Sequence, residues 1–223
     1  MAARPQAAFR GWPPEALEFL RDLEENNDRD WFKANRARYD EHLVAPTRAL
    51  AEDLAELGRP HLFRPWNDTR FRAGPPLKEH VGLAIGYEGA GGWYVELSLD
   101  GLLVAAGLHM PAPDQLDRLR RAIDAPRTAA SLTRAIGRAG RAGLEPNEPE
   151  LVRAPRGYPA DHPRLDLLRR RRLVVARRQD LRAWLHRPEA GRRIREGLDA
   201  AAPLVRWLRE HVGRARRPRD VAS

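Results

Sequence analysis

Two kinds of hydrophobic spacing divide this chain into helical and extended parts. Up to residue 58, apolar residues recur every three or four positions, as Leu17, Leu20 and Leu23 do, which is the spacing of one face of an α-helix. Over residues 93–108 apolar and polar residues alternate with a period of two, which is typical of half-buried β-strands. Helical spacing returns after Pro113 and again from Ile194 to Val212, and a short β-run is expected at Leu173–Ala176 between them.

The alternating region predicts an antiparallel β-meander over about residues 81–109. Asp100-Gly101 predicts a two-residue hairpin turn, so that Leu99 pairs with Leu102. With that pairing one face of the hairpin is apolar, and the opposite face collects polar and small residues: Tyr94, Glu96, Ser98, Leu103, Ala105, Gly107 and His109.

The order of these parts predicts an α+β fold, with the antiparallel meander covered by N-terminal and C-terminal helices. We expect one domain over residues 1–223, with flexible tails at 1–9 and 214–223. Residues 140–162, rich in Pro and Gly, are expected to form an extended loop. Pro203 is expected to kink or split the last helix.

Composition narrows the class of protein. The 223 residues contain no cysteine, which excludes disulfides and thiolate metal sites. No apolar run approaches the roughly 18 residues of a membrane helix, and no secretory signal is visible, so we expect a cytoplasmic protein without a membrane partner. The motifs of nucleotide-binding loops, zinc proteases and serine hydrolases are absent. We therefore assign no cofactor, no metal site and no catalytic residue.

The charge is uneven along the chain. Residues 1–110 hold 13 Lys and Arg against 17 Asp and Glu, a net charge of −4, whereas residues 111–223 hold 27 against 14, a net charge of +13. A basic half of this kind suits nucleic-acid phosphates. Only Lys33 and Lys78 among the 40 cationic residues are lysine, however, and so strong a preference for arginine also fits a GC-rich coding bias.

Two polar segments and one strand face hold the candidate ligand-binding residues. They are Asp68, Arg70, Arg72, Lys78 and His80 before the first strand, Tyr94, Glu96 and His109 on the meander, and Asp161, His162 and Arg164 in the second segment. Arginine offers an anion a bidentate fork and lysine a point charge, while histidine can act as a general base. The structural alternatives are an Asp68–Arg70 ion pair, a helix cap at Asp161 and an Arg164–Asp166 pair.

Several motifs together resemble a known family. They are Asn26-Asn27, Trp31-Phe32, Tyr39, Asp68-Thr69-Arg70-Phe71, Pro76, Lys78, Gly107 and the segment GYPADHPRLDLLR from Gly157. With these the chain resembles, from about Phe9 to Val212, the uncharacterised bacterial family called domain of unknown function 2461. The resemblance implies an α+β fold and a cytoplasmic bacterial protein, and it supplies no activity.

The chain departs from this family in the central motif. Members typically carry an Asp-Lys pair and a Pro-Tyr-Lys before the strand, where this chain has Ala73, Gly74 and Pro75, and Leu77 in place of the tyrosine. It therefore resembles a variant branch with Gly-Pro-Pro-Leu-Lys.

Three functions from different classes remain open. The first is recognition of a small anionic ligand in a pocket formed by segments 68–80 and 157–166. The second is nucleic-acid binding by the basic C-terminal half. The third is a structural or protein-interaction module without catalysis.

Overall fold

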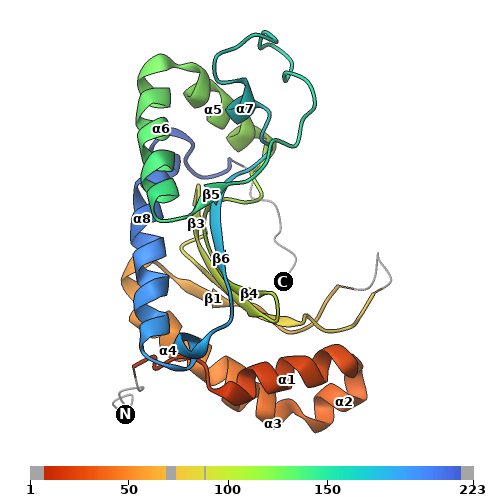
Figure 1. The fold of residues 1–223 in the computed structure, drawn as a ribbon. Coiled ribbons are helices and arrows are strands. Elements are labelled where there is room, and N and C mark those ends of the chain that lie inside the picture. Colours follow the sequence, from red (N-terminus) through yellow and green to blue (C-terminus); the bar gives the residue numbers. More distant parts are fainter. Residues whose placement is uncertain (1–7, 69–73, 88, 217–223) are drawn as a thin grey trace.

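The computed structural model describes residues 8–68, 74–87 and 89–216, and a six-stranded antiparallel sheet forms the centre of this part of the chain (Figure 1). The strands are β1 (Pro60–Leu62), β2 (His80–Ile85), β3 (Gly92–Ser98), β4 (Gly101–Leu108), β5 (Glu145–Pro146) and β6 (Leu173–Gln179). Their order in the sheet is β1-β2-β3-β4-β6-β5. The predicted α+β class is confirmed, and the predicted meander forms the β2-β3-β4 part of a larger sheet.

The register of the β3–β4 hairpin differs from the predicted one by two residues. Leu97, rather than Leu99, pairs with Leu102, and Ser98 pairs with Gly101. Because side chains alternate with a period of two, this shift leaves every residue on its predicted face. Gly101 has a φ of +131°, and a Cβ there would lie 2.5 Å from the carbonyl oxygen of Gln179. Glycine is therefore required by the close approach of β6.

The apolar face of the sheet packs against the long helix α8 (Glu189–His211). Trp93, on that face, donates from its indole Nε1 to the carbonyl oxygen of Leu198 at 3.2 Å. A Cβ on Gly197 would lie 3.0 Å from Cγ1 of Val104, so the absent side chain lets α8 approach the sheet closely. Helix α6 (Pro126–Arg141) packs along α8, where Trp207 Nε1 donates to the carbonyl oxygen of Thr128 at 3.0 Å.

Helix α8 is continuous through Pro203, so the split that the sequence allows at this residue does not occur. Proline removes the hydrogen bond to the carbonyl four residues earlier, which belongs to Asp199. Asp199 is exposed, so water can satisfy that carbonyl. The buried residues on either side, Ala201 and Leu204, continue the packing of the helix on the core.

The remaining helices lie at the two ends of the sheet. In Figure 1 α1, α2 and α3 lie below it, and α5 and α7 lie above it. Their bounds and those of the other helical segments are α1 (Pro14–Glu25), α2 (Arg29–Ala34), α3 (Arg36–Tyr39), the π-helix η1 (Asp40–Val44), α4 (Ala45–Asp53), η2 (Ala55–Leu57), α5 (Pro113–Asp124), α7 (Leu165–Leu168) and η3 (Ala183–His186). None of the helices described is both long and apolar enough to cross a membrane.

Two segments expected to be irregular are ordered by the sheet and the core. Within the expected loop 140–162, β5 pairs with β6, and Asn147 continues the contact by donating its backbone N–H to the carbonyl oxygen of Val174 at 2.9 Å. Phe9, placed by the sequence in a tail, is buried, with its ring 4.8 Å from that of Trp12.

Candidate functional site

The described residues of the first polar segment, on either side of 69–73, pair with one another as a hairpin between β1 and β2. Trp66 and Leu77 form a β-bridge, and the backbone N–H of Lys78 donates to the carbonyl oxygen of Pro65 at 2.7 Å. Two candidate residues, Arg70 and Arg72, lie outside the described residues. Asp68 is exposed, and it has an interaction partner in the structure.

Asn27 holds this hairpin against the N-terminal helices. Its Oδ1 accepts from the backbone N–H of Leu77 at 3.0 Å, and its Nδ2 donates to the carbonyl oxygen of Leu77 at 3.1 Å and to Glu79 Oε1 at 2.7 Å. The side-chain amide therefore pairs with the backbone of Leu77 as a neighbouring strand would. This contact gives one residue of the Asn26-Asn27 motif a structural role.

Four of the candidate residues gather on the face of the sheet opposite α8. Lys78 and His80 lead into β2, and Tyr94 and Glu96 stand on the neighbouring β3. Glu96 lies at the centre, with a side chain that is 15% exposed. Its Oε2 accepts from the Tyr94 hydroxyl at 2.7 Å and lies 3.8 Å from His80 Nε2.

Arg178 of β6, which the sequence analysis does not select, completes this group. Its Nη2 donates to Glu96 Oε1 at 3.3 Å and its Nη1 to Ser98 Oγ at 3.1 Å. We call His80, Tyr94, Glu96, Ser98 and Arg178 the sheet-face cluster. Its central carboxylate has a cation and a hydroxyl as partners, so its charge is compensated within the protein.

Burial shifts the pKa values of Tyr94 and His80 in this cluster and of the neighbouring Lys78. Burial, together with the nearby carboxylate of Glu96, raises the pKa of Tyr94, so the phenol keeps its proton and donates it to Glu96. Burial lowers the pKa of His80, although Glu96 opposes the shift. Burial and then the charge of Arg64 lower the pKa of Lys78, whose Nζ donates to the carbonyl oxygen of Arg64 at 3.0 Å.

The second polar segment packs on α5, away from this cluster. His162 is oriented by Asp124 rather than by its neighbour Asp161, with 3.0 Å between Nε2 and Oδ1. Since His162 Nδ1 accepts the backbone N–H of Arg164 at 3.1 Å, Nε2 is the nitrogen that donates to Asp124. The Arg164 guanidinium caps the end of α5 by donating to the carbonyl oxygens of Ile123 and Asp124.

The described residues of segments 68–80 and 157–166 therefore do not form one pocket, and that expectation is corrected. The first segment is fixed by Asn27, between α1 and α2, whereas the second is fixed to the end of α5, and Figure 1 shows α1 and α2 below the sheet and α5 above it. Asp161 is exposed. His109 follows β4, whose first residue pairs with Ser98, so it lies about 26 Å along the strand from that pair.

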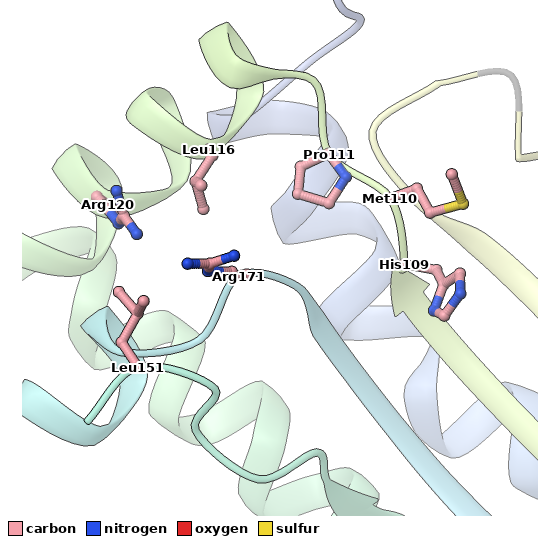
Figure 2. Close-up of a pocket in the computed structure, with 7 residues that line it drawn as sticks. All are labelled: His109, Met110, Pro111, Leu116, Arg120, Leu151 and Arg171. Atoms are coloured by element: carbon pink, nitrogen blue, oxygen red, sulfur yellow. The ribbon is translucent and has the colours of Figure 1, made fainter. Parts of the chain in front are cut away.

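A cavity of about 480 Å³ lies at the His109 end of the sheet. Seven residues line it, as Figure 2 shows: His109, Met110, Pro111, Leu116, Arg120, Leu151 and Arg171. They come from the segment after β4, from α5, and from the two loops on either side of α7. In Figure 2 the side chains of Arg120 and Arg171 point toward one another, with Leu116 and Leu151 on either side.

The two guanidiniums in this cavity have no anionic partner among the described residues. None of the seven lining residues is acidic, and neither Arg120 nor Arg171 forms a side-chain hydrogen bond or ion pair with the described part of the chain. The Nε of Arg120 is a buried donor without an acceptor. Glu150, beside Leu151 of the lining, is engaged by Arg172 at 2.8 Å and by the backbone N–H of Arg171 at 2.7 Å.

His109 adds a neutral group to the cavity wall. Burial, and then the charge of Arg172, lower its pKa, so the imidazole is uncharged at neutral pH. Across residues 8–68, 74–87 and 89–216 no group of three or more histidines and carboxylates could hold a metal ion. The chemistry available in this cavity is therefore cationic and apolar.

Of the candidate residues selected from the sequence, His109 lines this cavity, and neither arginine is among those candidates. Leu116 and Arg120 are four residues apart on one face of α5, but that spacing is equally typical of a solvated helix. Arg171 is one of four consecutive arginines. Among 38 arginines, no local signal separates these two from the others.

Comparison with known proteins gives one match. The family model described as "Conserved hypothetical protein (DUF2461)" matches residues 15–207. No curated protein and no solved structure matches the chain. Because the family model spans most of the sequence, the chain belongs to the family of conserved hypothetical proteins called domain of unknown function 2461.

Proposed function

We propose that the protein binds a small anionic ligand in the cavity between β4, α5 and the loops around α7. One observation carries this proposal: two guanidiniums that form no ion pair within the described part of the chain converge in a cavity whose lining contains no acid. Like charges repel, and a buried N–H without an acceptor costs about 1–3 kcal/mol. An anion bridging Arg120 and Arg171 would remove both costs.

The lining indicates the class of ligand. A cavity of about 480 Å³ has the size of a small-molecule site. Arginine recognises carboxylate and phosphate through two parallel hydrogen bonds. Met110, Pro111, Leu116 and Leu151 add apolar surface on the remaining walls. We infer a ligand with one carboxylate or phosphate group and a short apolar body.

The second candidate function is nucleic-acid binding, which the net charge of +13 in residues 111–223 favours. It requires no cavity, and it is compatible with a small-anion site elsewhere on the same chain. The third candidate, a module without catalysis, has its support in the hydrogen bonds of Glu96 within the sheet-face cluster and in the Asn27 contact, which both hold the fold.

Titration of the purified protein with butyl phosphate, butyrate and inorganic phosphate tests the anion site. We expect binding by isothermal calorimetry, and a rise in melting temperature with ligand concentration. Each charge-assisted hydrogen bond contributes about 1.5–3 kcal/mol, so Arg120→Gln and Arg171→Gln should each weaken binding by about 10- to 100-fold.

Arg121→Gln is the matched control, because Arg121 is the next residue of α5, is exposed and does not line the cavity. Equal losses for Arg120→Gln and Arg121→Gln would mean that general charge, rather than the cavity, attracts the anion. Absence of binding by the unsubstituted protein to all three probes would overturn the proposal.

A further inference from the structure

We propose that the exposed face of α6 binds the phosphate backbone of double-stranded DNA through four arginines. They are Arg127, Arg134, Arg138 and Arg141. This inference rests on the second candidate function, nucleic-acid binding, and names its surface and its partner.

The four arginines occupy one face of the helix. Their spacings of seven, four and three residues bring them to the same side of a helix with 3.6 residues per turn. All four are exposed. From Arg127 to Arg141 the helix rises about 21 Å, so the row is long enough to contact several phosphates.

No acidic group of α6 compensates this row. The helix has 16 residues and contains no Asp or Glu, although the whole chain has 31. Within the part of the chain that the structure describes, none of the four guanidiniums forms an ion pair or a side-chain hydrogen bond. Many other arginines are engaged, as Arg118 is with Asp114 at 2.8 Å and Arg193 with Glu189 at 2.7 Å.

The residues between the arginines are small. Ala130, Thr133 and Gly137 share the outward side of the helix, and a Cβ on Gly137 would meet only Arg141 Nη1, at 3.9 Å. Nothing bulky therefore keeps a partner away from the helix. The opposite side, with Ala129, Leu132, Ala135 and Ala139, is buried, and α6 packs on α8 (Figure 1).

This surface fits duplex DNA better than other polyanions. Single-stranded nucleic acid is held largely by aromatic stacking, and α6 has no aromatic residue. A membrane-surface helix needs an exposed apolar face, whereas the apolar face of α6 is buried. The major groove of B-form DNA admits an α-helix, while the major groove of A-form RNA is too narrow.

Fluorescence anisotropy with a short labelled DNA duplex tests the inference on the full chain. Four phosphate contacts predict a slope of about −3.6 in log K against log salt, which is a loss of about 100-fold in affinity between 50 and 200 mM salt. Substitution of all four arginines of α6 by glutamine should remove most of this slope and weaken binding at low salt by at least about 10-fold.

The control variant carries the same loss of charge at scattered sites. It replaces Arg21, Arg48, Arg153 and Arg187, which are exposed and lie outside α6, by glutamine. Arginine and glutamine have similar helix propensities, so we expect both variants to fold as the parent does. Circular dichroism and thermal unfolding check this before binding is compared.

The outcomes separate the inference from the function on which it rests. Duplex DNA binding that is lost in the α6 variant and retained in the control supports both. Binding that falls equally in the two variants overturns the role of α6 and leaves nucleic-acid binding standing. Binding only to duplex RNA overturns the choice of DNA as the partner and leaves nucleic-acid binding standing. Absence of nucleic-acid binding at low salt, or binding only to anionic lipid vesicles, overturns both.

Discussion

The unsatisfied Nε of Arg120 lowers the stability of the folded protein, whereas its guanidinium is proposed to bind the anion. Unfolding and ligand titration measure these two effects separately. Its buried Nε has no acceptor, so Arg120→Met, which keeps much of the apolar stem, removes an unsatisfied donor and a charge. We expect the ligand-free variant to be as stable as the parent or more stable by up to about 2 kcal/mol in urea unfolding, and to lose affinity for butyl phosphate.

Arg118 provides the comparison on the same helix. Its guanidinium binds Asp114 and the carbonyl oxygens of Val212 and Arg214, so Arg118→Met should destabilise the protein by about 1–3 kcal/mol. If Arg120→Met lowers stability as much as Arg118→Met does, Arg120 has a structural partner and the anion-site argument fails.

Two histidines make stability depend on pH. Burial lowers the pKa of His80 and of His109 in the folded protein, so below the unfolded-state pKa of about 6.5 the unfolded chain binds more protons. The free energy of unfolding should therefore fall as pH drops from 7 to about 5. In urea unfolding, the double variant His80→Gln/His109→Gln should show a shallower fall over this window. An unchanged slope would contradict the prediction.

At the scale of elements, Asn27 joins the turn after α1 to the hairpin before β2. Asn27→Ala leaves the buried backbone N–H of Leu77 without its acceptor, while the carbonyl oxygen of Leu77 still accepts from Asn67 Nδ2 at 3.0 Å, so we expect a loss of about 1–3 kcal/mol in the free energy of unfolding. Asn26 is the matched control. It is exposed, and its side chain donates only to the carbonyl oxygen of Asp22, so Asn26→Ala should change stability by about 0.5 kcal/mol or less.

The elements with strong periodicity are those that the sequence predicts. The helix around Leu17–Leu23 and the strands β3 and β4 follow their patterns, because each buries one regular face. The two-residue error in the hairpin arose because Gly101 was assigned to the turn, whereas the approach of β6 requires it. Such a contact comes from a segment more than 70 residues away, and local sequence does not contain it.

At the scale of the whole molecule, the cavity shows why the candidate site was only partly predictable. His109, Arg120 and Arg171 belong to three segments that no short motif connects, and the fold alone brings them together. Tyr94 and Glu96, in contrast, share a face of one strand, and alternation predicts their proximity to each other. The proximity of side chains within one strand or helix can be derived from the sequence. The proximity of side chains from distant elements depends on how those elements pack.

The position of β6 between β4 and β5 has a consequence for biosynthesis. Residues 1–146 of the nascent chain contain five of the six strands, but β5 has no partner until residues 173–179 emerge from the ribosome. Until then the long edge of β4 presents unpaired backbone groups, and the apolar face that α8 later covers is open to water. The described sheet is thus completed by β6 and covered by α8, and until both have emerged its open edge and apolar face expose the nascent chain to aggregation.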